Sequence, residues 1–132
     1  MTLNQEISAF LSENKDNEAV PEFMEGLAGA QKKLTEATMW LMQNGMSNPN
    51  NAGAGSVDYM HMLGLATFAY MWAKMALVAQ AKIDDGSNDQ FYPNKLITGR
   101  YFVLRMLPML DSHLAKIKTG ADPVMALDAA AF

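Results

Sequence analysis

The chain has 132 residues, which fits one domain; half of them are hydrophobic and only 18% are charged. This composition argues against disorder, and the shortage of charge indicates that part of the surface is covered by another surface. The net charge of -4 argues against a nucleic-acid-binding protein, and the absence of cysteine excludes a disulfide scaffold, a cysteine zinc site and a thiol nucleophile.

The N-terminal segment, residues 1–18, is predicted to be a short helix followed by a polar linker. Thr2 and Gln5 have the spacing of a capping box, and a short apolar stripe follows them. The segment has no basic start and no long apolar run, so it does not resemble a secretory signal. We therefore expect a cytoplasmic protein whose main helical domain spans residues 19–132.

A long second helix is predicted to begin at Pro21, because proline is well tolerated at the first helical position. Its apolar residues alternate at spacings of 4 and 3, which is typical of a bundle helix. They are Phe23, Leu27, Ala30, Leu34, Ala37 and Leu41. Asn44-Gly45 predicts the end of this helix, and residues 46–55, rich in Asn and Gly, predict a mobile loop.

The third helix is expected to run from about Val57 to about Asp84, with Ser56 as its cap and Asp58 in its first turn. It is apolar on nearly every side, so it needs partners on every side. Residues 59–81 approach the length of a membrane span, but polar residues interrupt them and no basic cluster flanks them. The prediction is a buried bundle helix and no membrane span.

A second apolar seam marks the fourth helix, which starts between residues 89 and 93. Its members are Leu96, Gly99, Val103, Met106, Leu110, His113 and Ile117. Pro108 lies inside this seam and predicts a kink, because it removes one backbone hydrogen bond. Gly120 predicts the helix end, and Asp122-Pro123 predicts a short last helix through residues 124–131.

These elements predict an all-α fold. No segment alternates with the period of a strand, and the short connections favour antiparallel neighbours that cross at a shallow angle. The expected architecture is an antiparallel up-and-down four-helix bundle with a short extra terminal helix. We expect five residues in particular to pack between its helices: Leu34, Leu63, Trp72, Val103 and Leu110.

Candidate chemistry in the sequence is sparse. A di-iron bundle needs two Glu-x-x-His pairs, whereas Asp58 and His61 supply one related spacing. Asp111, Ser112 and His113 are consecutive, so they point apart on a helix and do not form a triad. The sequence therefore predicts no catalytic residue, no cofactor-binding residue and no metal ligand, and His113 is interpreted as a hydrogen-bonded residue at the core boundary.

Two features point to binding rather than catalysis. The 12 methionines fill irregular cores and also suit adaptable interfaces. On the fourth helix, Lys95, Arg100 and Tyr101 are candidates for an interface or for contact with a CoA phosphate.

The third and fourth helices carry an ordered set of residues with a family resemblance. The set comprises Asp58-Tyr59, Leu63-Gly64, Trp72-Ala73, Phe91, Lys95, Gly99-Arg100-Tyr101-Phe102, Leu107-Pro108, Gly120 and Phe132. In this set, over about residues 20–132, the chain resembles the C-terminal helical extension of a long branch of the acyl-CoA dehydrogenases, of the acetyl-CoA-dehydrogenase-like kind.

The resemblance implies a parent flavoenzyme that removes two hydrogens from an acyl-CoA, with FAD as hydride acceptor and a Glu as base, both in upstream domains. The chain itself would hold no FAD and would act as an accessory bundle that packs on the core domains or on a second subunit, in a homo-oligomer. Two other classes stay open, a stand-alone helical module that binds a protein or an acyl group, and a bundle metalloprotein.

Overall fold

The structure, a computed structural model, describes residues 2–132, and the regular elements in this range are helical. In chain order they are α1 (Leu3–Glu13), α2 (Pro21–Ser47), α3 (Pro49–Asp84), α4 (Phe91–Tyr101), the π-helical turn η1 (Phe102–Met106), α5 (Met109–Thr119), α6 (Asp122–Met125) and the 3-10 turn η2 (Ala129–Ala131). The predicted all-α class is confirmed.

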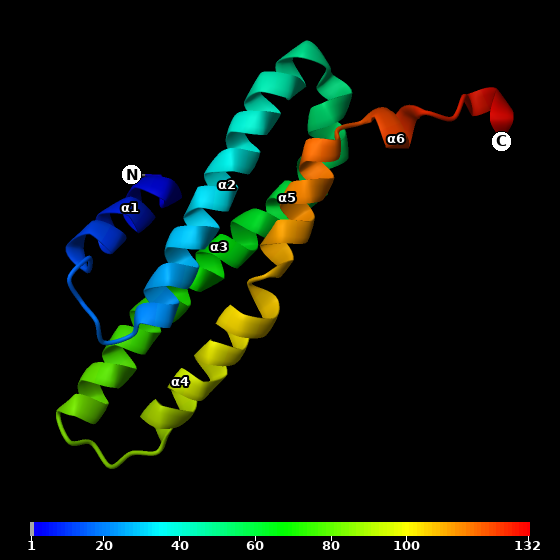
Figure 1. The fold of residues 1–132 in the computed structure, drawn as a ribbon. Helices are drawn as coiled ribbons and strands as arrows, with labels where there is room; N and C mark the ends of the chain where they lie inside the picture. Colours follow the sequence, from blue (N-terminus) through cyan, green and yellow to red (C-terminus); the bar gives the residue numbers. More distant parts are fainter. Residues whose placement is uncertain (1) are drawn as a thin grey trace.

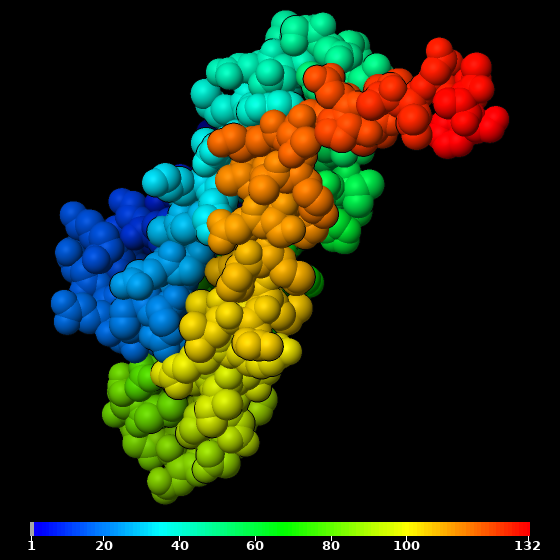
Figure 2. Space-filling view, turned by 45° about the vertical axis from the view of Figure 1, so that its right-hand side comes forward, coloured from blue at the N-terminus to red at the C-terminus, as the bar shows by residue number. Residues whose placement is uncertain are grey.

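Three long rods make up the body of the molecule: α2, α3, and the combined α4–η1–α5 (Figure 1). Successive rods run in opposite directions, and α3 contacts both of the others. Helix α1 has only 11 residues and lies along part of α2, so it is much shorter than the three rods. The last residues, with α6 and η2, extend away from the bundle (Figures 1 and 2).

The core is built from large side chains of α2 and α5 against small residues of α3. The predicted stripe of α2 is buried from Phe23 to Ala37. On α3 the buried set is rich in alanine, which lets the neighbouring rods approach closely: Ala66, Ala69, Ala73, Ala76 and Ala79.

Four of the five predicted packing residues lie in or against this core. Leu34 and Leu110 are buried, and the half-buried Trp72 and Val103 pack on it. The prediction for Leu63 was wrong, since this side chain is 40% exposed.

The predicted loop at residues 46–55 is helical, which is the largest correction to the sequence analysis. Helix α2 continues to Ser47, and Asn48 alone separates it from α3, where Pro49 takes the first position. The side chain of Asn48 accepts a hydrogen bond from the Asn50 backbone at 3.1 Å and so caps α3. Pro49 does not interrupt a helix because its missing N–H has no helical partner at that position.

Two glycines at the borders of this segment, Gly45 and Gly55, allow close helix packing. A methyl group on Gly45 would lie 3.3 Å from the Ala52 side chain, and one on Gly55 would lie 3.1 Å from Leu41. Neither glycine has a positive φ. The predicted cap at Ser56 was therefore wrong, and Asp58 lies well inside α3 rather than in its first turn.

The predicted kink at Pro108 is confirmed as an interruption between α4 and α5. Before it the backbone widens into the π-helical turn η1, where the Leu107 N–H donates to the Phe102 carbonyl, five residues back. The extra residue shifts the seam by one position. Consequently Phe102 and Leu107 are buried, whereas Met106, predicted to be in the seam, is exposed.

Most helix ends follow the sequence prediction. The capping box of Thr2 and Gln5 is formed, Pro21 begins α2, and Gly86 and Gly120 end α3 and α5 with positive φ angles of 86° and 76°. The last helix differs from its prediction: α6 has four residues, and Asp122 is its first residue rather than its cap.

Helix α3 is long and apolar enough to cross a membrane by length and composition alone. Of its most apolar window, 44% is buried inside the bundle. A core helix of a bundle passes the same test, so this observation is weak evidence for a span.

Candidate functional site

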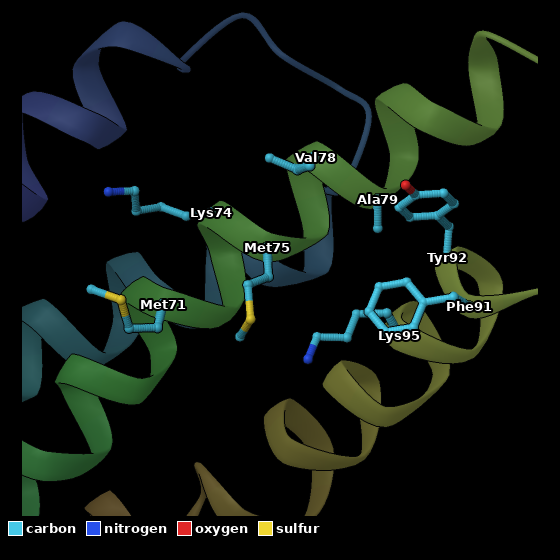
Figure 3. A pocket seen from close by; sticks show the side chains of 8 residues that line it. All are labelled: Met71, Lys74, Met75, Val78, Ala79, Phe91, Tyr92 and Lys95. Atoms are coloured by element: carbon cyan, nitrogen blue, oxygen red, sulfur yellow. The ribbon is translucent and has the colours of Figure 1, made fainter. Parts of the chain in front are cut away.

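An open, mainly apolar groove of about 450 Å³ lies between the C-terminal half of α3 and the start of α4 (Figure 3). Its walls consist mainly of flexible and aromatic side chains: Met71, Met75, Val78, Ala79, Phe91 and Tyr92. Two lysines, Lys74 and Lys95, complete the lining. The groove offers an apolar surface with cations and no acid, which suits a chain-like apolar group with an anionic end.

Lys95 extends into the space between α3 and α4, whereas Lys74 points away from α4 (Figure 3). The ammonium of Lys95 lies 5.0 Å from the centre of the Trp72 ring and 5.9 Å from that of Phe91. Within residues 2–132 neither lysine has a carboxylate within 4.0 Å. The aromatic faces therefore hold the Lys95 cation without neutralising it.

The three candidate residues of α4 do not form one site. Lys95 faces the groove, while Arg100 reaches across to α2 and pairs with Glu22 at 2.6 Å. Tyr101 points to solvent and is 60% exposed. An interface with a protein or a CoA contact by these residues stays a prediction, and any such contacts would be made on separate faces of α4.

A polar cluster between α3 and α5 was missed by the sequence analysis. Asp58 accepts hydrogen bonds on one oxygen from His113 Nδ1 at 2.7 Å and from Lys116 Nζ at 2.6 Å. The His113 ring also stacks on His61, with 5.3 Å between ring centres. The interpretation of His113 as a hydrogen-bonded residue at the core boundary agrees with these contacts.

The pKa of the Asp58 carboxyl reflects two opposing effects. Burial raises this pKa, but the hydrogen bonds from Lys116 and His113 lower it by more, so the pKa lies below its ordinary value. The signal in the sequence was the i, i+3 spacing of His113 and Lys116, which places both on one face of α5. The sequence does not show that this face meets Asp58, because that contact depends on the register between α3 and α5.

Residues 2–132 contain no group of three His, Asp or Glu side chains placed to hold a metal ion. The cluster around Asp58 has a single carboxylate, and its oxygen is already shared by two hydrogen-bond donors. The cluster of Asp58, His113 and Lys116 holds α3 against α5, and we call it the interhelical clamp.

Comparison with known sequences identifies the family. Residues 3–128 match the family described as acetyl-CoA dehydrogenase C-terminal like. The chain belongs to this family. It is also 30% identical over 111 residues to the broad-specificity linear acyl-CoA dehydrogenase FadE5 of Mycobacterium tuberculosis (strain ATCC 25618 / H37Rv).

The aligned region covers 80% of this chain and 18% of FadE5, so the chain spans about a fifth of the length of this relative. The predicted resemblance to a C-terminal acyl-CoA dehydrogenase domain is confirmed. The proposed division between residues 18 and 19 is not tested by this match and stays a prediction.

The acyl-CoA dehydrogenase C-terminal domain described here does not fit FAD. A flavin needs polar groups for its ring and its diphosphate, yet within residues 2–132 no polar or charged side chain is buried. In the same range every buried side-chain nitrogen or oxygen already has a hydrogen-bond partner. These residues therefore offer no vacant polar cradle for a flavin.

Proposed function

We propose that this chain is the C-terminal accessory domain of an FAD-dependent acyl-CoA dehydrogenase that introduces a double bond between the α and β carbons of an acyl-CoA. The observation that carries the proposal is the family match over residues 3–128 together with the small share of FadE5 that the chain spans. In this arrangement the catalytic Glu and the FAD belong to upstream domains, and the bundle is not catalytic alone. We further propose a cytoplasmic homo-oligomer.

The outer face of α4, continued into η1, is the surface we assign to the upstream core. Ile97, Tyr101 and Leu104 follow one another at spacings of 4 and 3 residues, and each is at least 60% exposed. Burying such side chains is favourable by about 25 cal/mol per Å² of apolar surface. Arg100 follows next to this face but is already paired with Glu22, so the apolar side chains carry the assignment.

The parent enzyme is tested by tagging the chromosomal gene at its 3′ end and purifying the native protein. The expected result is a flavin absorption spectrum and a polypeptide, or a bound subunit, well above the 14.5 kDa of this chain. A native protein of this size without flavin or flavoprotein partner would overturn the proposal.

The docking face is tested in that native protein with Leu104→Asp, and the matched control is Leu127→Asp in the exposed C-terminal segment. We expect the first variant to lower the melting temperature of the flavoprotein by roughly 2–4 °C, or to release a separate subunit, because it buries a charge. The control should do neither. Equal behaviour of the two variants would contradict the assignment of this face.

The groove between α3 and α4 favours a second candidate function, a module that binds acyl groups. Its apolar walls would hold the chain, and Lys95 would hold the anionic end. Calorimetry of the 132-residue chain with a long-chain fatty acid tests this function. Binding that Lys95→Met weakens, and that Lys32→Met on the surface of α2 does not, would support it, whereas no heat at millimolar ligand would contradict it.

A further inference from the structure

The outer side of α3 carries an apolar stripe over residues 57–78 of the helix. We call it the α3 stripe, and it consists of Val57, Met60, Gly64, Phe68, Met71, Met75 and Val78. Successive members are 3 or 4 residues apart, which is the repeat of a helix that packs along another helix. At 1.5 Å per residue the α3 stripe is roughly 32 Å long.

The described helices leave most of this stripe uncovered. Met71, Met75 and Val78 also line the groove beside α4. The Phe68 ring lies edge-on to that of Phe102, with 6.3 Å between ring centres. Val57, Met60, Phe68 and Val78 are each 58–60% exposed, and Met71 is 41% exposed. The helices α2, α4 and α5 pack on the alanine-rich side of α3 instead. None of the seven stripe positions is charged, which is unusual for a helix face exposed to water.

In the central part of the α3 stripe, a small residue can face a large one of a second copy. In an antiparallel pair of α3 helices with its two-fold axis at residue 66, Gly64 faces Phe68 of the second copy, and Val57 faces Met75. Small residues thus meet large ones on both sides of the axis. A methyl group on Gly64 would have no atom of its own chain within 4 Å, so the space beside Gly64 is open to a partner.

We propose that the α3 stripe is the interface with a second copy of this chain, in an antiparallel, two-fold symmetric α3–α3′ pair centred on residue 66. The inference rests on the proposed function in one respect, the homo-oligomer. It specifies which face of each copy forms the interface and how the two α3 helices are aligned. An isologous contact of this kind closes on itself and covers the central part of the stripe on both copies. It uses a different surface from the outer face of α4 assigned to the upstream core.

The area of the stripe fits such a dimer. With roughly 100 Å² exposed per half-exposed side chain, the five most exposed members supply on the order of 500 Å² per copy. A standard stable interface buries about 800 Å² per partner. Contacts beside the stripe, such as Leu63 at 40% exposure, would make up the difference.

A lipid surface explains the stripe less well than a second copy does. Lipid chains select for apolar character but not for an alternation of Gly64 with Phe68, and membrane-bound amphipathic helices usually carry basic residues on both flanks. The α3 stripe has Lys74 beside it and Lys82 beyond its end, with no matching lysine or arginine on the N-terminal half of α3. Membrane binding is accordingly one of the results that would overturn the proposal.

The register is tested by light scattering and sedimentation of the 132-residue chain. We expect a dimer, and Gly64→Phe should weaken it at least about tenfold because two Phe side chains would then collide at each side of the axis. Adding Phe68→Ala to this variant restores a large–small pair and should return the affinity to within about threefold of the original. Gly29→Phe on α2 is the matched control, since a methyl group there also has no atom within 4 Å.

The direction of the helices is tested independently with a spin label. The chain has no cysteine, so Lys82→Cys gives a single labelling site at the exposed end of α3. Residue 82 lies 16 residues from the axis, so in the antiparallel pair the helical rise separates the two labels by roughly 48 Å. In a parallel pair the two labels should lie less than about 20 Å apart.

Four results would overturn the proposal. The first is a chain that is monomeric at about 100 μM. The second is a dimer that Gly64→Phe leaves intact, or whose affinity the double variant does not restore. The third is a distance of less than about 20 Å between the labels, and the fourth is a monomer that floats with vesicles of neutral and anionic phospholipid. Circular dichroism of each variant must first show the helical fold. Because these measurements use the chain without a flavoprotein, their outcome is independent of whether an upstream dehydrogenase core exists.

Discussion

Asp58 illustrates at the scale of a single residue how a carboxylate gains a role from its neighbours. Its side chain is 17% exposed and receives hydrogen bonds from His113 and Lys116 of α5. Because these donors stabilise the charged form, the pKa of Asp58 is lower in the folded protein than its ordinary value of 3.8. Asp58 therefore contributes stability above about pH 4, and this contribution is lost as the pH falls through the lower, folded pKa.

We expect Asp58→Asn to lower the free energy of unfolding at pH 7 by about 1–2 kcal/mol, because it removes the charge that both donors hold. At pH 3 the difference between the two proteins should be smaller, since protons then compete for Asp58. Urea unfolding at both pH values measures the effect.

The control is Asp111→Asn, whose ion pair with Lys33 is exposed on both sides. Its effect should stay below about 0.5–1 kcal/mol at either pH. A loss for Asp58→Asn that is as large at pH 3 as at pH 7 would contradict the clamp.

At the scale of an element, α4 is held against α2 and α3 at Gly99. A methyl group at this position would lie 2.6 Å from the Phe23 ring and 2.8 Å from the Trp72 ring. Phe23 is buried and Trp72 is half-buried against the core, so neither ring can move aside without disturbing it. Glycine is thus required here for a close approach between rods, and not for a turn.

Gly99→Ala should destabilise the protein by about 1–3 kcal/mol, despite the better helix propensity of alanine, because the core becomes overpacked. Thermal and urea unfolding measure the change.

Gly29→Ala is the matched helical control. Open space surrounds this position, so the change should stabilise the protein by about 0.5–1 kcal/mol. If both variants are stabilised, the close approach at Gly99 is not rigid.

At the scale of the whole molecule, the bundle and the C-terminal segment are distinct parts. Residues 122–132 are exposed throughout and extend from the bundle. The segment carries apolar side chains, with Phe132 94% exposed. Ala121 is buried, and its N–H donates to Asn51 at 2.9 Å, so the bundle ends at this residue.

Removing residues 122–132 should change the free energy of unfolding of the bundle by less than about 0.5 kcal/mol, because few native contacts are lost. Urea unfolding of the shortened chain checks this expectation. A chain that also lacks Ala121, and with it the hydrogen bond to Asn51, provides the contrast. A loss above about 1 kcal/mol on removing residues 122–132 alone would show that the segment packs on the bundle in solution.

The sequence by itself determined the all-α class, the stripe of α2, the interruption at Pro108 and the C-terminal ends of α3 and α5. These features depend on periodicity and on local backbone chemistry, which the chain carries at each position. The ordered residues of the third and fourth helices also sufficed for the family, which the match over residues 3–128 confirmed.

Other features were decided only by tertiary structure. Residues 46–55 have loop composition, yet Gly45 and Gly55 pack closely between α2 and α3 and the segment is helical. The π-helical turn moved Met106 out of the seam, and the register of α3 against α5 brought Asp58 to His113. Each depends on which rods become neighbours and at what height, and no local pattern in the chain encodes that.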